Sequence, residues 1–167
     1  MWIQQLRKPS FDSESESSRF LNYLMEEVFT DFLGLGVEQT SSHLENYPIR
    51  SSVGIEGPWT GAVVVCATED AAARVAAAML GMEPDELEAE DVADCWGEVA
   101  NLLAGSVIRS LPGGHALTTP ETVSQTEGTL LPPHALEKLF SSHFLLCGPG
   151  VSLSVHEKKT AVAAGGE

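Results

Sequence analysis

Basic residues are scarce in this chain of 167 residues. Nine lysines and arginines stand against 24 aspartates and glutamates, which gives a net charge of −15 at pH 7. Nucleic-acid binding needs cations that displace counterions from phosphates, so this charge argues against a nucleic-acid partner and also disfavours an anionic membrane surface. No apolar run approaches the length of a membrane span, and Arg7 and Lys8 are not followed by an apolar stretch. We therefore expect a soluble cytoplasmic protein.

Cysteine is scarce as well, and its spacing matches neither a disulfide framework nor a zinc site. Cys66, Cys95 and Cys147 are far apart and lie in apolar runs, which is typical of reduced, buried thiols. The five histidines share no metal-ligand spacing, and the chain has no phosphate-binding P-loop, no nucleophile elbow and no C-x-x-C pair. These absences predict no metal site on this chain and no covalent catalysis.

Apolar residues make up 43% of the chain and charged residues 20%, a composition that excludes disorder of the whole. The length suits one domain with a real core. The segment Ser10–Ser18 is rich in serine and acidic residues, and such a composition buries too little apolar surface to order the chain. We therefore predict that it is a flexible lead-in. We therefore expect an acidic lead-in over 1–18, one domain over 19–158 and a disordered tail over 159–167.

Apolar spacing and turn residues predict the elements of the first half of the domain. The residues whose helical spacing predicts a first helix are Phe20, Leu21, Leu24, Val28 and Phe32. Gly34 then ends this pattern. Strand-like runs over 47–56 and 60–67 flank a Gly-Pro turn and predict a hairpin, and an alanine-rich helix over 71–80 follows with Thr68 as its cap.

The second half continues with helices placed among extended segments. The predicted elements are a long helix between Asp85 and Leu111 with Pro84 in its first turn, an extended stretch over 116–124, a turn or brief helix over 130–139, and a closing hairpin of 143–147 and 151–156. Helices and strands do not alternate strictly, as they would in a parallel sheet. The order instead predicts an α+β domain, an antiparallel sheet with helices packed on it.

The long helix carries the best indication of function. At about 100° per residue, its apolar residues gather on one side; they are Val92, Trp96, Val99, Leu103 and Val107. Asp94, Glu98, Asn101 and Gly105 gather on the opposite side. Three polar side chains in line, followed by a residue without one, form a flat surface that another molecule can approach closely. A solvated helix face is the alternative interpretation.

The stretch Gly61–Pro120 resembles the CheC/CheX/FliY family of chemotaxis phosphatases, and within it the CheX-like branch. Those proteins carry an acid or Ser followed by E-x-x-N, in a helix that comes after an M-L-G-M-type break. The residues at the three motif positions here are Asp94, Glu98 and Asn101, and Met79–Met82 supplies the break. Pro120 matches the proline that opens the next strand in the family, after a gap a few residues shorter than usual.

The resemblance implies a CheC/CheX-like fold and a phosphatase for the aspartyl phosphate of a CheY-type response regulator, in chemotaxis or two-component signalling. Asn101 would orient the attacking water, and Glu98 would pair with a lysine of the receiver domain. Asp94 would make a side contact with the partner. Gly105, from its place on the same helix face and not from the resemblance, would permit close approach of the partner. Magnesium would come with the receiver, so no cofactor is expected on this chain, and a homodimer joined through the sheets is expected.

Two further expectations follow from the resemblance. Two-site members of the family carry a second E-x-x-N on the first helix, but here Glu27 is followed by Thr30 in place of Asn, which leaves one intact site. The alternative to an enzyme is a non-catalytic interaction module that binds a receiver domain, a flagellar-switch component or another signalling protein.

Overall fold

The computed structural model describes residues 13–42, 47–124, 136–146, 148 and 150–158. Its helices are α2 (Ser13–Met25), the π-helix η1 (Glu26–Phe32), α3 (Glu69–Leu80), the 3₁₀ turn η2 (Pro84–Glu86) and α4 (Ala89–Arg109). Its strands are β1 (Glu38–Thr40), β2 (Ile49–Glu56), β3 (Gly61–Ala67), β4 (Ala116–Leu117), β5 (Glu121–Ser124), β6 (Leu136–Leu145) and β7 (Val151–Lys158). No helix in this part of the chain is both long and apolar enough to cross a membrane.

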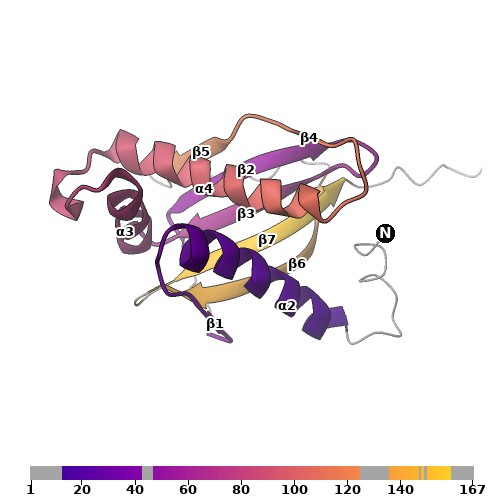
Figure 1. The fold of residues 1–167 in the computed structure, drawn as a ribbon, viewed down its shortest axis with the longest axis horizontal. Coiled ribbons are helices and arrows are strands. Elements are labelled where there is room, and N and C mark those ends of the chain that lie inside the picture. Colours follow the sequence, from indigo (N-terminus) through magenta and orange to yellow (C-terminus); the bar gives the residue numbers. More distant parts are fainter. Residues whose placement is uncertain (1–12, 43–46, 125–135, 147, 149, 159–167) are drawn as a thin grey trace, which may run out of the picture.

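The seven strands within the described residues form one antiparallel sheet. Their order is β1-β6-β7-β3-β2, with β4 and β5 both pairing with β2. Helix α4 packs on β2, β3 and β5, and α2 packs on β6, so both helices lie on the same side of the sheet (Figure 1). Helix α3 packs beside α4. The predicted α+β domain, an antiparallel sheet with helices packed on it, is confirmed.

Both predicted hairpins form. Strands β2 and β3 pair from Ile49 opposite Ala67 to Ile55 opposite Gly61. The closing hairpin is longer than predicted, because β6 begins at Leu136 and pairs there with Lys158. Residues 136–139, which we expected in a turn or brief helix, are therefore strand, and cross-strand pairing decides their conformation. The rest of that predicted segment, 130–135, lies outside the described residues.

The extended stretch 116–124 is divided into two short strands. Between them, Thr118 Oγ1 accepts a hydrogen bond of 2.8 Å from the backbone N–H of Gly54, while Thr118 N donates to the Gly54 carbonyl at 2.9 Å. Pro120 has no backbone N–H for the ladder and directly precedes β5. The hydrogen bond of the Thr118 side chain and the proline at 120 therefore account for the break between β4 and β5.

Helix α2 begins inside the segment Ser10–Ser18 that we expected to be flexible, so that expectation is wrong from Ser13 on. Ser17 is buried, and Ser18 Oγ accepts a hydrogen bond of 2.6 Å from Gln39 Nε2, which holds the start of α2 against β1. Residues 1–12 and the predicted tail 159–167 lie outside the described residues.

The predicted inward face of the first helix changes where α2 becomes η1. Leu21, Leu24 and Val28 are buried as expected, but Phe32 is 67% exposed. A π turn closes one residue later than an α turn, so the inward position moves from 32 to Leu33, which packs against the core. Phe29, which the pattern did not include, is fully buried.

The helices α3 and α4 begin and end largely as predicted. Thr68 Oγ1 accepts a hydrogen bond of 3.2 Å from Ala71 N and caps α3. Pro84 lies in the separate turn η2, so its predicted place in the long helix is wrong. Helix α4 begins at Ala89 because the backbone N–H of Glu88 donates to Asp91 Oδ2 at 2.9 Å, which fixes the first turn there.

Candidate functional site

The inner face of α4 is anchored in the core. Trp96, Val99, Leu103 and Val107 are fully buried, and Val92 packs against the core from its edge. Trp96 Nε1 donates a hydrogen bond of 3.2 Å to the Val65 carbonyl of β3, and its ring meets Phe29 of η1 edge to face at 6.3 Å. These contacts join the helix to the middle of the sheet and to η1. They therefore fix the rotation of α4 about its own axis.

Gly97 adds a second restraint, which the sequence analysis missed. A Cβ at this position would lie 3.2 Å from Thr122 Oγ1 and 3.4 Å from Pro120 Cβ. Strand β5 therefore approaches α4 closely at the residue next to Glu98. A glycine in a helix interior costs about 1 kcal/mol of stability relative to alanine. Its presence in the middle of a predicted helix was therefore the sequence signal that another element packs closely there.

Four residues lie together on the outward side of α4, and we name them the α4 stripe: Asp94, Glu98, Asn101 and Gly105. Asp94 and Glu98 are exposed, whereas Asn101 and Gly105 are half-buried. Among the described residues, the side chains of Asp94, Glu98 and Asn101 form no hydrogen bond or ion pair with one another or with a neighbour. A Cβ at Gly105 would meet no atom within 4 Å. The structure thus brings the predicted site residues together and leaves their polar groups available to another molecule.

The stripe continues by one more turn, to Arg109, which the sequence analysis did not include. Arg109 follows Gly105 by four residues and is the only basic residue of α4. Its Nη2 donates to Glu27 Oε1 of η1 at 2.7 Å and to Ser106 Oγ at 2.9 Å. The available signal was the four-residue spacing alone, because Glu27 is far away in the sequence.

The altered second motif on the first helix is engaged in internal contacts. Glu27 forms the ion pair with Arg109. Thr30 Oγ1 donates a hydrogen bond of 3.2 Å to the Leu35 carbonyl. Both residues lie in η1, and this segment differs from α4 in its helical geometry as well as in the missing asparagine.

The two thiols within the described residues, Cys66 and Cys95, show no sign of activation. Burial raises the pKa of Cys95, and the nearby charges of Asp91 and Asp94 raise it further. Burial also raises the pKa of Cys66, which lies on β3. Cys147 lies outside the described residues. In the part of the chain that the structure describes, no three His, Cys, Asp or Glu residues gather closely enough to hold a metal ion.

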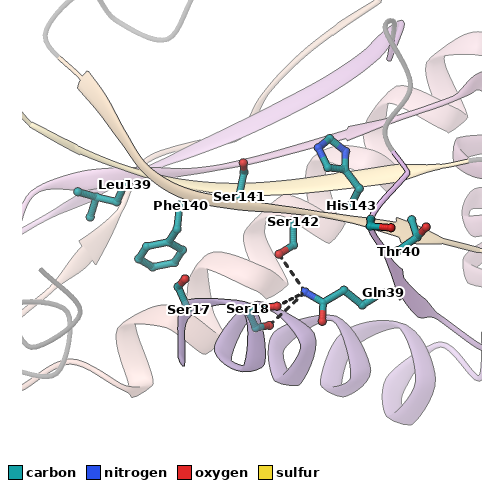
Figure 2. A pocket seen from close by; sticks show the side chains of 10 residues that line it. Ser17, Ser18, Gln39, Thr40, Leu139, Phe140, Ser141, Ser142 and His143 are labelled. Atoms are coloured by element: carbon teal, nitrogen blue, oxygen red, sulfur yellow. Dashed lines mark hydrogen bonds between the residues drawn. The ribbon is translucent and has the colours of Figure 1, made fainter. Parts of the chain in front are cut away.

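A hollow lies away from the stripe, between α2, β1 and β6. Figure 2 shows Gln39 reaching from β1 toward Ser18 of α2 and Ser142 of β6, and its Nε2 bonds Ser142 Oγ at 3.0 Å. The lining is polar but carries no acid, lysine or arginine among the described residues. The titratable side chain in this described lining is that of His143, and the hollow shares no residue with the stripe.

A comparison with protein families identifies this chain. The family model for the chemotaxis phosphatase CheX matches residues 49–142, more than half of the chain. The chain belongs to the CheX family. The matched region includes every residue of the α4 stripe. No curated protein sequence is recognisably similar to the chain.

Solved structures of CheX proteins and their relatives share the fold. The CheX chemotaxis protein from Vibrio vulnificus is similar with a TM-score of 0.66 and 21% identity, over 81% of this chain and 91% of that one. CheX in the CheX–CheY–BeF₃–Mg²⁺ complex from Borrelia burgdorferi has a TM-score of 0.64 and 17% identity, over 84% and 98%. FliY from Thermotoga maritima has a TM-score of 0.55 and 16% identity, over 86% and 90%. The predicted CheC/CheX-like fold is confirmed.

Proposed function

We propose that this CheX-family protein hydrolyses the aspartyl phosphate of a CheY-type response regulator. The observation that carries the proposal is the α4 stripe. Asp94, Glu98 and Asn101 occupy the motif positions on the outward face of a helix whose inner face is fixed by Trp96. A site on a rigid element holds its side chains in a constant geometry, which a positioning mechanism requires.

We assign to Asn101 the role of orienting the attacking water. An aspartyl phosphate is an acyl phosphate and already reacts with water, so a phosphatase succeeds mainly by placing water in line with the leaving oxygen. A carboxamide has both an acceptor and donors, and it orients water without adding negative charge beside the phosphoryl group. A carboxylate at this position would repel that group.

Glu98 is the residue that we assign to anchoring the receiver, through an ion pair with a receiver lysine. Asp94 lies one turn before it and makes a side contact with the partner. Gly105 allows close approach, because the space above it is open. Magnesium comes with the receiver's acidic pocket, so this chain needs no metal ligands of its own.

The comparisons support the partner. The Borrelia burgdorferi CheX that shares this fold was solved together with CheY, BeF₃ and Mg²⁺. The net charge of −15 works against long-range attraction to an acidic receiver, so local contacts must supply the affinity. We therefore expect a transient complex.

A homodimer joined through the sheets is part of the proposal. Strand β1 pairs only with residues 143–145 of β6. The remaining outer edge of β6, from Leu136 to Ser142, has no partner strand among the described residues, and an open edge offers backbone groups to a second chain. Light scattering across a range of protein concentrations measures the mass of the particle and tests this assignment.

The decisive experiment follows the loss of phosphate from a panel of phosphorylated CheY-type receivers with this protein present. Wild type is expected to accelerate the loss, and Asn101→Ala is expected to reduce the acceleration by about 10²-fold, the usual contribution of one oriented catalytic group. Asn22→Ala, which removes a half-buried amide from α2, is the matched control and should behave as wild type. Equal rates for wild type and Asn101→Ala would contradict the assignment.

The non-catalytic interaction module remains the second candidate. The observation that favours it is the short connection between Asn101 and Pro120, which departs from the family pattern. Binding measured with and without BeF₃ on the receiver separates the two. Binding that depends on BeF₃ without any turnover would identify the module.

A further inference from the structure

Arg109 lies on the stripe but has no part in the proposed chemistry. Counting about 100° per residue, it projects from the same side of α4 as Glu98 and Gly105. Its side chain is 62% exposed, although it forms an ion pair. The stripe therefore carries acids at one end and a single cation at the other, with the open space at Gly105 next to the cation.

The hydrogen bonds of Arg109 occupy only one of its nitrogens. Nη2 donates to Glu27 Oε1 and to Ser106 Oγ, which uses both of its hydrogens. Among the described residues, the two N–H groups of Nη1 and the N–H of Nε have no acceptor. The guanidinium is thus held in one orientation with three donors unused.

Glu27 contributes to this orientation at a cost. Its Oε1 accepts the bond from Arg109, but its Oε2 is buried and has no hydrogen-bond partner among the described residues. Leaving a buried carboxylate oxygen unpaired costs free energy. Arginine–carboxylate pairs frequently engage both carboxylate oxygens, whereas Arg109 engages only Oε1 of Glu27.

We propose that Arg109 binds a carboxylate on the receiver and so fixes the direction in which the receiver lies along α4. This inference rests on the proposed function. Glu98 and Arg109 are eleven residues apart, which is about 16 Å along the helix. The preferred receiver therefore presents a cation for Glu98 and a carboxylate for Arg109 at that separation. Glu27 and Ser106 are positioning residues for the guanidinium.

The phosphoryl group is not the anion that Arg109 binds. The motif places the phosphoryl group at Asn101, eight residues from Arg109 and about 12 Å away along the axis. An arginine bonded to Glu27 does not span that distance. A carboxylate elsewhere on the receiver is the acceptor that remains, and a guanidinium suits it because its donors match the geometry of a carboxylate.

The test measures both turnover and the affinity for a receiver carrying BeF₃. Arg109→Ala is expected to raise KM and the dissociation constant about tenfold and to change kcat less than twofold. Arg109→Lys should recover part of the affinity, since it restores the charge without the planar donors. Glu27→Gln should weaken affinity about threefold. Arg74→Ala, which removes an exposed arginine from α3, is the matched control and should change neither constant.

The outcomes separate this inference from the proposed function. If Arg109→Ala lowers the melting temperature but keeps wild-type KM and affinity, the ion pair only joins the two helices and the inference is wrong. If wild type binds without turnover and Arg109→Ala binds about tenfold more weakly, the phosphatase assignment fails and the inference stands. If wild type binds no receiver in the panel, both are wrong.

Discussion

Substitution of Gly105 separates the stability of α4 from its use as a docking surface. Gly105 lies in the helix interior without a positive φ, and a Cβ there would meet no atom within 4 Å. Gly105→Ala is therefore expected to stabilise the fold by about 0.5–1 kcal/mol, because alanine loses less conformational entropy on folding. In a domain of this size that gain raises the melting temperature by roughly 1–4 °C.

The same position should tolerate a larger residue in the fold but not in the complex. Gly105→Leu places a side chain above the stripe beside Asn101, so kcat/KM for receiver dephosphorylation should fall at least about tenfold while the melting temperature stays at or above that of wild type. Thermal unfolding followed by circular dichroism and the phosphate-loss assay measure the two quantities. Wild-type turnover by a stable Gly105→Leu would refute the assignment of this surface.

Gly97 provides the control within the same helix. The space beside it is filled, since a Cβ would lie 3.2 Å from Thr122 Oγ1. Gly97→Ala should therefore gain less stability than Gly105→Ala, and Gly97→Leu should destabilise the fold by about 1–3 kcal/mol through overpacking. The helix thus has a glycine at these two positions for different reasons. Gly97 leaves room for strand β5, whereas Gly105 leaves room for a partner.

Three further predictions concern the scaffold. Trp96→Phe should destabilise the fold by about 2–4 kcal/mol in urea titration, because it leaves a small cavity and deprives the Val65 carbonyl of a donor. Burial, together with the nearby charges of Arg50 and Lys138, lowers the pKa of His156 from 6.5 to about 4. The unfolded chain therefore takes up the proton first, and the free energy of unfolding should fall by up to about 3 kcal/mol as the pH drops from 6.5 to 4. His156→Gln should flatten this pH dependence in urea titrations. Thr68→Ala should cost about 1 kcal/mol, measured the same way, because Ala71 N loses its cap.

The sequence predicted those features that depend on local periodicity. Helix α4 repeats one apolar pattern over 21 residues, so both its buried face and the stripe opposite could be assigned before the structure was known. The β2–β3 hairpin followed from a Gly-Pro turn between two apolar runs, and the cap of α3 followed from Thr68. The family resemblance, which the comparisons confirm, added the assignment of the motif.

The features that the sequence did not reveal depend on contacts between distant residues. The exposure of Phe32 results from a π turn, which tertiary packing imposes on a pattern that reads as ordinary helix. The ion pair of Arg109 with Glu27 joins residues 82 positions apart. Strand β6 begins at Leu136 because β7 pairs with it there. No local signal encodes these three outcomes.

The altered second motif gives a final prediction, that restoring its asparagine does not restore a site. Thr30→Asn in an Asn101→Ala background should leave the phosphate loss at the rate of Asn101→Ala alone. One reason is that Arg109 already engages the carboxylate of Glu27. The other is that Glu27 and Thr30 lie in a π-helix, where residues three apart diverge further around the axis than Glu98 and Asn101 do in α4.

Adding Arg109→Ala should release Glu27 and still yield no activity, since the π geometry remains. Recovery of activity in the double variant would show that the missing amide alone inactivates this position, and recovery only in the triple variant would show that the ion pair does.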